Sequence, residues 1–272
     1  METSKEGFTG NLGSAGLDVT LNYFTNQPDF LSVSNADLAI IFKSLSKKDP
    51  KTKEKALNDL LSIIEEKSTE FDDIAVVCWV KLYPKIALDN SKDVRAMTHQ
   101  IQGTLLKILG SKRYGKYLKI TMPIWLMGTM DPDKSVSRTA ARLLLDNFQG
   151  DETKFEKVWE IFEEQIINLV GSVATIESPE TLSDPRYLSD SEIQIKYDRT
   201  LMVSIDMLLK IYKKCQLVTS IELILDLDVI WERFVHSVKE DTMNLRLFKC
   251  ILTLILSTCS KENFLLESMD QK

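Results

Sequence analysis

The chain has 272 residues, of which 44% are hydrophobic and 27% are charged, and its formal net charge is −6. This length and apolar content allow a sizeable buried core, in one or two domains or in one continuous array. The chain contains only 10 glycines and 7 prolines, which disfavours a turn-rich β fold and predicts an all-α protein. No apolar run reaches the roughly eighteen residues that a membrane span needs, and the first residues lack the apolar core of a signal peptide. We therefore expect a cytoplasmic protein that has no membrane contact.

The charge is divided unevenly along the chain. Residues 34–150 carry 19 Lys/Arg and 14 Asp/Glu, a net charge of +5, whereas residues 151–272 carry 14 and 22, a net charge of −8. Such an asymmetry favours a basic half that faces an acidic partner such as RNA. The alternative is that both halves simply carry ordinary solvated helix faces.

The first 33 residues are expected to form an N-terminal arm. They are rich in glycine and serine up to residue 16, which predicts disorder there. Apolar and aromatic side chains follow between residues 17 and 33. They indicate an extended segment that lies on the first helices of the chain or, less favoured, on a partner.

The stretch "KKDPKTKEKAL", residues 47–57, predicts the start of a helix. The Asp49 carboxylate can accept hydrogen bonds from the free N–H groups of a first turn, and Pro50 suits the first helical position, where no N–H is needed. Apolar Leu57, Leu60 and Ile64 then follow at helical spacing. With a shorter amphipathic helix over residues 35–45, this segment predicts a helical hairpin.

The same plan recurs twice. Predicted helix pairs over 71–88 and 92–109, and over 114–130 and 134–148, also turn at an aspartate, so that Asp49, Asp89 and Asp131 are 40 and 42 residues apart. One helix pair per period, with a basic residue soon after the turn aspartate, resembles HEAT repeats. Residues 34–150 are therefore predicted to form three HEAT-like repeats of an α-solenoid, in which neighbouring pairs share a core.

After Gly150 the pattern weakens, but helical periodicity continues through residues 151–272. One-sided apolar stripes predict a long helix over 151–170 and another over 191–212, with two more near 226–238 and 243–258. Between the first two, residues 177–190 are rich in turn-forming residues. Loops of this length are often functional or mobile.

The sequence shows no catalytic motif. Walker, GxGxxG, GxSxG and HExxH patterns are absent, and neither His99 nor His236 has a Cys or His at metal-ligand spacing. Cys78, Cys215, Cys250 and Cys259 lie in apolar stretches without a CxxC pair, as expected of buried thiols in a reducing compartment. Cys215 would be the most suggestive nucleophile if the chain transferred a group itself. We expect a non-catalytic chain without cofactor, metal or small-molecule ligand.

Basic side chains near the turns are the natural candidates for contact with a partner. The turn-proximal candidates are Lys47, Lys48, Lys51, Lys53, Lys92, Arg95, Lys134, Arg138 and Arg142. In a second set, over residues 111–117, Lys112, Arg113 and Lys116 alternate with Tyr114 and Tyr117. That composition suits phosphate contacts and stacking on bases, although lysines snorkelling at an ordinary helix start would look the same. Stacked repeats are expected to bring both sets onto one edge.

The run "WVKLYPKIALDNSKDVR", residues 79–95, is more specific than a generic repeat, and with its flanks over 35–148 it resembles the N-terminal region of the listerin family. Signature residues such as Trp79 and Pro84 can equally serve to pack the repeat. The resemblance implies a long solenoid with a RING domain at its far C-terminus, which ubiquitinates nascent chains stalled on large ribosomal subunits.

The resemblance further implies that this N-terminal part docks the ligase onto the large subunit and onto a companion factor that senses peptidyl-tRNA. A RING domain requires eight closely spaced Cys and His ligands, whereas this chain has 4 Cys and 2 His in all. The ligase chemistry is therefore expected outside these residues. The alternative is a HEAT scaffold that binds another acidic partner such as tubulin.

Overall fold

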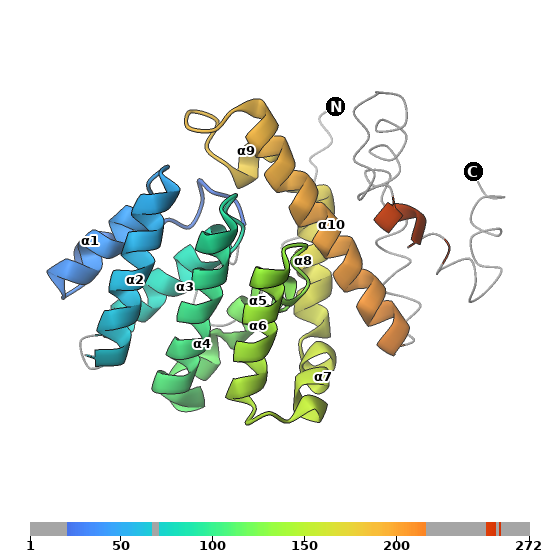
Figure 1. Ribbon diagram of the computed structural model, residues 1–272, viewed down its shortest axis with the longest axis horizontal. Coiled ribbons are helices and arrows are strands. Elements are labelled where there is room, and N and C mark those ends of the chain that lie inside the picture. The colour runs from blue at the N-terminus through green and yellow to red at the C-terminus, as the bar shows by residue number, and fades with distance from the viewer. Residues whose placement is uncertain (1–20, 67–70, 216–248, 254–255, 257–272) are drawn as a thin grey trace, which may run out of the picture.

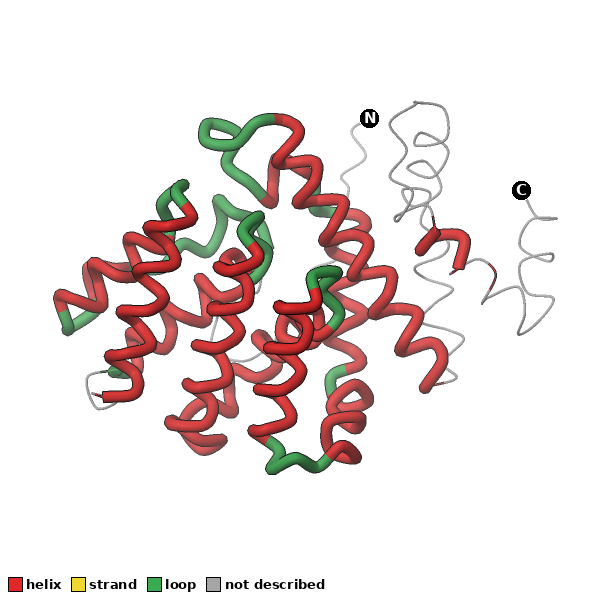
Figure 2. Tube along the Cα trace, in the orientation of Figure 1, coloured by secondary structure: helices red, strands yellow, loops and turns green. Residues whose placement is uncertain are grey.

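The computed structural model describes residues 21–66, 71–215, 249–253 and 256. Within these residues the regular structure is entirely helical, without a strand (Figures 1 and 2), and no described helix is long and apolar enough to span a membrane. The expected disordered segment before residue 17 and most of the two predicted helices after residue 225 lie outside the described residues. The α-helices are α1 (Ala36–Leu45), α2 (Pro50–Glu66), α3 (Asp73–Ile86), α4 (Lys92–Tyr114), α5 (Leu118–Thr129), α6 (Lys134–Asn147), α7 (Glu152–Ile161), α8 (Glu163–Thr175), α9 (Pro179–Leu182) and α10 (Asp190–Cys215).

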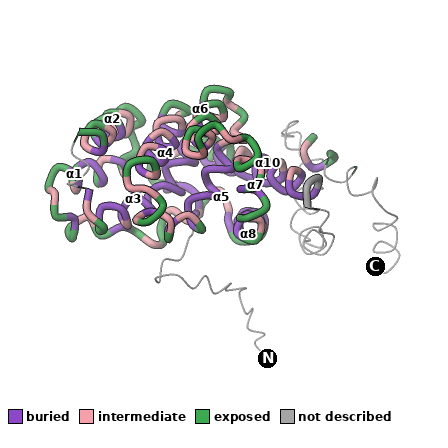
Figure 3. Tube along the Cα trace, turned by 90° about the horizontal axis from the view of Figure 1, so that it is seen from below, coloured by how far each residue is buried: buried purple, intermediate pink, exposed green. Residues whose placement is uncertain are grey.

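Helices α1 to α6 form three hairpins that stack side by side (Figure 1). Helices α2, α4 and α6 contact one another in one layer, and α1, α3 and α5 form the second. Figure 3 shows buried positions running through the array. The largest side chains there, including Trp79 and Trp125, are fully buried. The predicted all-α solenoid is confirmed.

The turns inside the three hairpins differ in length, measured from the turn aspartate to the residue that caps the following helix. Asp49 caps α2 directly, because its Oδ2 accepts from Thr52 N at 2.9 Å. In the next two hairpins the cap lies two residues after the turn aspartate, since Ser91 caps α4 and Asp133 caps α6. The first turn is thus two residues shorter, although the three hairpins have the same topology.

The prediction of a single helix over residues 151–170 is wrong. The segment divides into α7 and α8 at Phe162, whose backbone leaves the helical region at φ −105° and ψ 18°. Both halves of the predicted stripe still face the core, because Trp159 and Ile166 are fully buried, whereas Ile161 beside the break is 69% exposed. Amphipathic spacing predicted the buried residues correctly but not the interruption.

Helix α10 packs along α8 and also contacts α5 and α7 (Figure 1). Its predicted stripe is confirmed, since each of its apolar members is buried. They are Tyr197, Leu201, Ile205, Leu208 and Tyr212.

The described part of the N-terminal arm, from residue 21 onward, lies on the chain itself. Tyr23 N donates to Thr181 O at 2.7 Å, and its hydroxyl donates to Ser46 O at 3.3 Å. The Lys85 ammonium donates to Thr25 O at 2.5 Å. Burial lowers the pKa of Lys85 to about 8. The arm therefore joins the α1–α2 turn to the segment around α9, as the intramolecular interpretation expected.

Residues 177–190 form an internally bonded loop around the short helix α9. Ser178 caps α9 and exchanges hydrogen bonds with Thr181 in a capping box. Arg186 donates to both oxygens of Asp184, with its closest nitrogen 2.6 Å away. These bonds fix the loop beside the first two turns.

Candidate docking surface

One largely buried ion pair joins each of the first two hairpins to the next. Lys53 Nζ of α2 lies 2.5 Å from Asp89 Oδ2 at the following turn, and Arg95 Nε of α4 lies 2.7 Å from Asp131 Oδ2 at the turn after that. A second Arg95 nitrogen reaches Asp131 Oδ1 at 3.0 Å, so this pair is bidentate. We call these two ion pairs the turn ladder. It fixes the register of three successive hairpins.

The second turn is also held through its backbone carbonyls. Arg95 donates to Asp89 O at 2.9 Å, and Arg199 from α10 donates to Leu88 O at 2.8 Å and to Asp89 O at 2.9 Å. Burial is the main cause that lowers the pKa of Arg199 to about 10, followed by the charge of Arg95. A residue from the distant acidic half therefore braces the centre of the turn ladder.

Two of the expected partner-binding residues thus have an internal role. Arg95 is 4% exposed and Lys53 is engaged with Asp89, so neither side chain presents a free charge at the surface. Arg113 similarly pairs with Asp73 at 2.9 Å and donates to Phe71 O at 2.7 Å. The sequence indicated that basic residues follow each turn but not which of them face inward.

The remaining turn-proximal lysines are exposed. The three intra-hairpin turns lie along the same edge of the array in Figures 1 and 2. We call the exposed lysines at these turns the turn-edge lysines. They are Lys47, Lys48, Lys51, Lys92 and Lys134.

Two further candidates, Arg138 and Arg142, extend this basic surface down α6. Both side chains are exposed, and they follow Lys134 at intervals of four residues, so all three share one face of the helix. Arg142 Nη1 lies 3.4 Å from Asp146 Oδ2 in a solvent-exposed pair. Such pairs contribute little to stability, so they leave the arginine available to a partner.

The expectation that all the basic clusters share one edge is wrong. Lys112 and Lys116 are exposed, but they lie at and just after the C-terminal end of α4, whereas Lys92 lies at its start. The helix breaks at Gly110 (φ 68°, ψ 170°), and its continuous run places Lys92 and Leu109 about 26 Å apart. The 111–117 cluster is therefore at the opposite edge from the turns.

Stacking of bases on the tyrosines of this cluster is also ruled out in this structure. Tyr114 is fully buried and Tyr117 is 5% exposed. The Tyr114 hydroxyl donates to Gln102 Oε1 at 2.8 Å, and Trp79 Nε1 donates to the same oxygen at 3.0 Å. The Gln102 side chain thus joins the two helices of the second hairpin, and Pro84 is buried in α3.

The buried titratable groups have the character of core residues. His99 is 1% exposed and its Nδ1 lies 3.1 Å from the Tyr83 hydroxyl. Burial lowers the pKa of His99 to about 4 and raises that of the Cys78 thiol to about 11. The Cys250 thiol is partly buried, and its pKa is raised to about 12 for the same reason. The side chains of Cys215 and Cys259 lie outside the described residues.

Sequence reasoning did not identify Lys196 and Arg199 of α10. Both are basic residues three positions apart on a stripe that otherwise reads as an ordinary amphipathic helix. Lys196 donates to Leu182 O at 2.7 Å, and Arg199 reaches the second turn. The only signal in the sequence was that these two cations interrupt the predicted apolar face of the helix.

These hairpins and their exposed lysines define the class of protein: an all-α solenoid with a basic edge formed by its turns. Residues 33–272 match the family described as E3 ubiquitin-protein ligase listerin, N-terminal domain. The chain belongs to this family.

Several proteins named E3 ubiquitin-protein ligase listerin are similar to the chain. The Saccharomyces cerevisiae protein is 36% identical over 232 residues, which cover 81% of this chain and 15% of that protein. The Neurospora crassa protein is 32% identical over 231 residues, covering 82% and 14%. The Drosophila melanogaster protein is 30% identical over 169 residues, covering 62% and 10%. The chain thus spans about one seventh of the first two relatives.

Proposed function

We propose that this domain docks a RING-type ubiquitin ligase onto the large ribosomal subunit in cytoplasmic ribosome-associated quality control. Its contacts would include the companion factor that senses peptidyl-tRNA, so that stalled nascent chains are ubiquitinated. Membership in the listerin N-terminal family and the ligase names of the relatives support this role. We assign no catalytic step to the domain, because the RING chemistry needs more Cys and His ligands than the chain contains.

The row of turn-edge lysines carries the proposal. Successive turns of a solenoid repeat the same surface at each hairpin, which suits an extended partner. Lysines without a tight partner can contact phosphates or acidic protein groups at the cost of displacing only water and counterions. We also assign the hairpins to the HEAT type, because their period of 40 and 42 residues fits that repeat.

Pelleting of the chain with purified large ribosomal subunits tests the proposal. In one variant, Lys47, Lys48, Lys92 and Lys134 are changed to Glu. In the matched control the same number of exposed lysines, Lys107, Lys112, Lys116 and Lys119, are changed to Glu away from the turns. We expect the first variant to bind at least about tenfold more weakly and the control to remain within about twofold.

Equal losses in the two variants would show that the edge has no special role. Failure of the folded wild-type chain to pellet would contradict docking by this domain alone. Pelleting with microtubules tests the alternative of an acidic partner such as tubulin, which the proposal predicts not to bind.

A further inference from the structure

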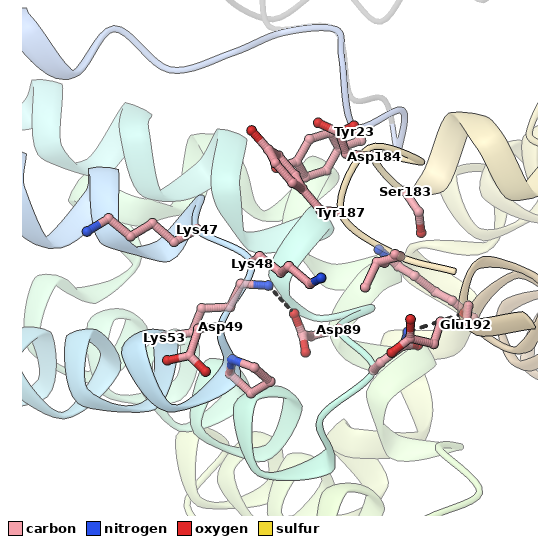
Figure 4. Close-up of a pocket in the computed structure, with 14 residues that line it drawn as sticks. Tyr23, Lys47, Lys48, Asp49, Lys53, Asp89, Ser183, Asp184, Tyr187 and Glu192 are labelled. Carbon is pink, nitrogen blue, oxygen red and sulfur yellow. Dashed lines mark hydrogen bonds and ion pairs between the residues drawn. The ribbon is translucent and has the colours of Figure 1, made fainter. Parts of the chain in front are cut away.

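A pocket of about 300 Å³ lies where three segments of the chain meet (Figure 4). The α1–α2 turn forms one wall, the α3–α4 turn forms the floor, and the loop before α10 with the first turns of that helix forms the other wall. Tyr23 of the N-terminal arm contributes an aromatic surface beside Tyr187. The volume is at the lower end for ligand sites and suits one or a few side chains.

The carboxylates in the pocket walls are already engaged by the chain itself. Each accepts hydrogen bonds that cap a helix, close a turn or form an ion pair. The carboxylates are those of Asp49, Asp89, Asp184 and Glu192, and among their donors are Thr52, Lys53, Arg186 and Ser189 respectively. They contribute structure to the walls and do not call for a cationic ligand.

The hydrogen-bond donors in the walls, in contrast, are incompletely used. The Ser183 side chain is 1% exposed, its Oγ has no hydrogen-bond partner among the described residues, and Figure 4 shows it pointing into the pocket. A buried hydroxyl left unpaired costs free energy, so native structures normally satisfy such groups. This hydroxyl indicates that a polar group belongs beside it.

Two ammonium groups border the same space. Lys196 is 6% exposed and, within the described residues, its three N–H donors make one hydrogen bond, to Leu182 O at 2.7 Å. Lys48 is exposed and makes no side-chain hydrogen bond or ion pair with other described residues. In Figure 4 its side chain is directed toward Asp89 and Glu192, whereas the neighbouring Lys47 points away.

The charges around Lys196 do not offset the cost of burying its ammonium group. Burial lowers its pKa to about 7, the charge of Asp89 opposes that effect, and Lys53 and Arg199 add to it. An anion in the pocket would favour the charged ammonium, so it would gain from Lys196, Lys48 and the Ser183 hydroxyl together.

We propose that this pocket binds a single carboxylate, presented by an acidic side chain or a C-terminus of a protein partner. The four wall carboxylates would repel the many charges of a nucleic acid backbone, whereas one carboxylate fits between the free donors. Pro50 and Leu188 supply the apolar surface that a peptide segment buries around such a group. The inference goes beyond ribosome docking, because the pocket would take this ligand whichever surface the turn-edge lysines contact.

The test uses the full 272-residue chain with ¹³C-labelled lysine side chains and NMR detection of each lysine ε-methylene. The probe is N-acetylglutamate α-amide, which carries one side-chain carboxylate, and the matched neutral probe is N-acetylglutamine α-amide. We expect saturable shifts of Lys48 and Lys196 with the first probe only. The pKa of Lys196 should rise on saturation, and Lys55, an exposed lysine of α2 outside the pocket, should not respond.

Substitutions then separate the pocket from general charge effects. We expect Ser183→Ala and Lys48→Gln each to weaken binding of the glutamate probe by about tenfold, because each removes a hydrogen bond to a charged group. Lys55→Gln removes the same charge from an exposed position of α2 that does not line the pocket and should leave binding unchanged. Lysine spectra of each variant without probe verify that the fold is retained.

Three results would overturn the inference. These are an absence of saturable shifts, equal responses to the glutamine probe, and equal shifts at Lys55. Displacement of the glutamate probe by an oligouridylate, at lower concentration than by a glutamate-rich peptide, would assign the pocket to RNA instead and would also contradict the proposal. Ribosomal subunits do not enter this test, so its failure is distinguishable from failure of the docking proposal.

Discussion

Helices α1 to α6 and helices α7 to α10 are held in their places by different interactions. In the first region a basic residue on the second helix of one hairpin binds the turn aspartate of the next hairpin. In the second region α7 and α8 meet at Phe162 without a turn aspartate, and packing relies on buried apolar residues such as Trp159 and Ile166. The turn ladder therefore ends at Asp131.

The comparison shows that a regular repeat needs complementary groups on neighbouring hairpins. Asp151 caps α7 much as Asp133 caps α6, but within the described part of the chain its ion pair is with Lys154 of its own first turn, at 3.5 Å. The second region instead contributes to the ladder from outside, through Arg199. Local caps define helices, and contacts between hairpins define their register.

The largest effect on the comparison should come from breaking the bidentate pair of the ladder. Arg95→Ala leaves the carboxylate of Asp131, whose side chain is 8% exposed, without its partner. We expect the free energy of unfolding to fall by about 3–5 kcal/mol, as for other buried pairs that lose one member. Urea unfolding measures the change.

The matched control is Arg138→Ala, which removes an exposed arginine from the second helix of the next hairpin. This control should change stability by less than about 0.5 kcal/mol. A loss of similar size in both variants would contradict the separation of ladder arginines from surface arginines.

Acid should weaken the first region through His99. The histidine is buried against Tyr83, and burial lowers its pKa from 6.5 to about 4. The charge of Asp131 partly opposes this shift, and that of Arg95 adds to it. Between these values the unfolded chain binds a proton that the folded protein excludes. Stability is therefore complete above pH 6.5 and falls by about 3 kcal/mol as the pH decreases to 4.

Urea unfolding at several pH values between 4 and 6.5 measures this effect. His99→Gln should reduce the slope of stability with pH in this window, whatever its effect at pH 7. An unchanged slope would show that the linkage comes from other groups.

Two glycines, one in each region, extend the comparison, because an added methyl group would meet a neighbour at one and open space at the other. A Cβ at Gly128 in α5 would lie 2.2 Å from His99 Nε2, so Gly128→Ala should cost about 1–3 kcal/mol through overpacking. At Gly171 in α8 nothing lies within 4 Å of an added Cβ, so Gly171→Ala should stabilise the helix by about 0.5–1 kcal/mol. Thermal unfolding of both variants checks the opposite signs, and the same sign in both would refute the packing difference.

The smallest predicted effect concerns the arm that joins the two regions. Tyr23→Phe removes the hydroxyl that donates to Ser46 O. The expected loss is about 0.5–1 kcal/mol, with faster hydrogen exchange of the Tyr23 amide that bonds Thr181 O. If exchange at this amide were unchanged, the hydroxyl would not be what holds the arm.

The sequence predicted the features that depend on neighbouring residues. Caps such as Asp49 and the apolar stripe of α10 follow from local chemistry and periodicity, and both are confirmed. The family resemblance, carried by the run from Trp79 to Arg95, is confirmed as well.

Features that depend on three-dimensional neighbours were not predictable in the same way. Whether Arg95 or Lys92 faces inward depends on where the next turn aspartate lies, which sequence spacing alone leaves open. The break at Phe162 changes no periodicity, and Arg199 acts on a turn 110 residues away. The prediction that Lys112 shares an edge with the turns was wrong, because the helical run of α4 up to Gly110 separates Lys112 from them.

The salt dependence of binding to large ribosomal subunits tests the central claim most directly. The wild-type chain is compared with a variant in which all five turn-edge lysines are changed to Gln, which keeps their size and removes their charge. Each phosphate contact that is lost should reduce the slope of log K against log salt concentration by about 0.7–0.9. We predict weaker binding and a clearly shallower slope for the variant, at unchanged stability. An identical slope and affinity would contradict docking through this edge.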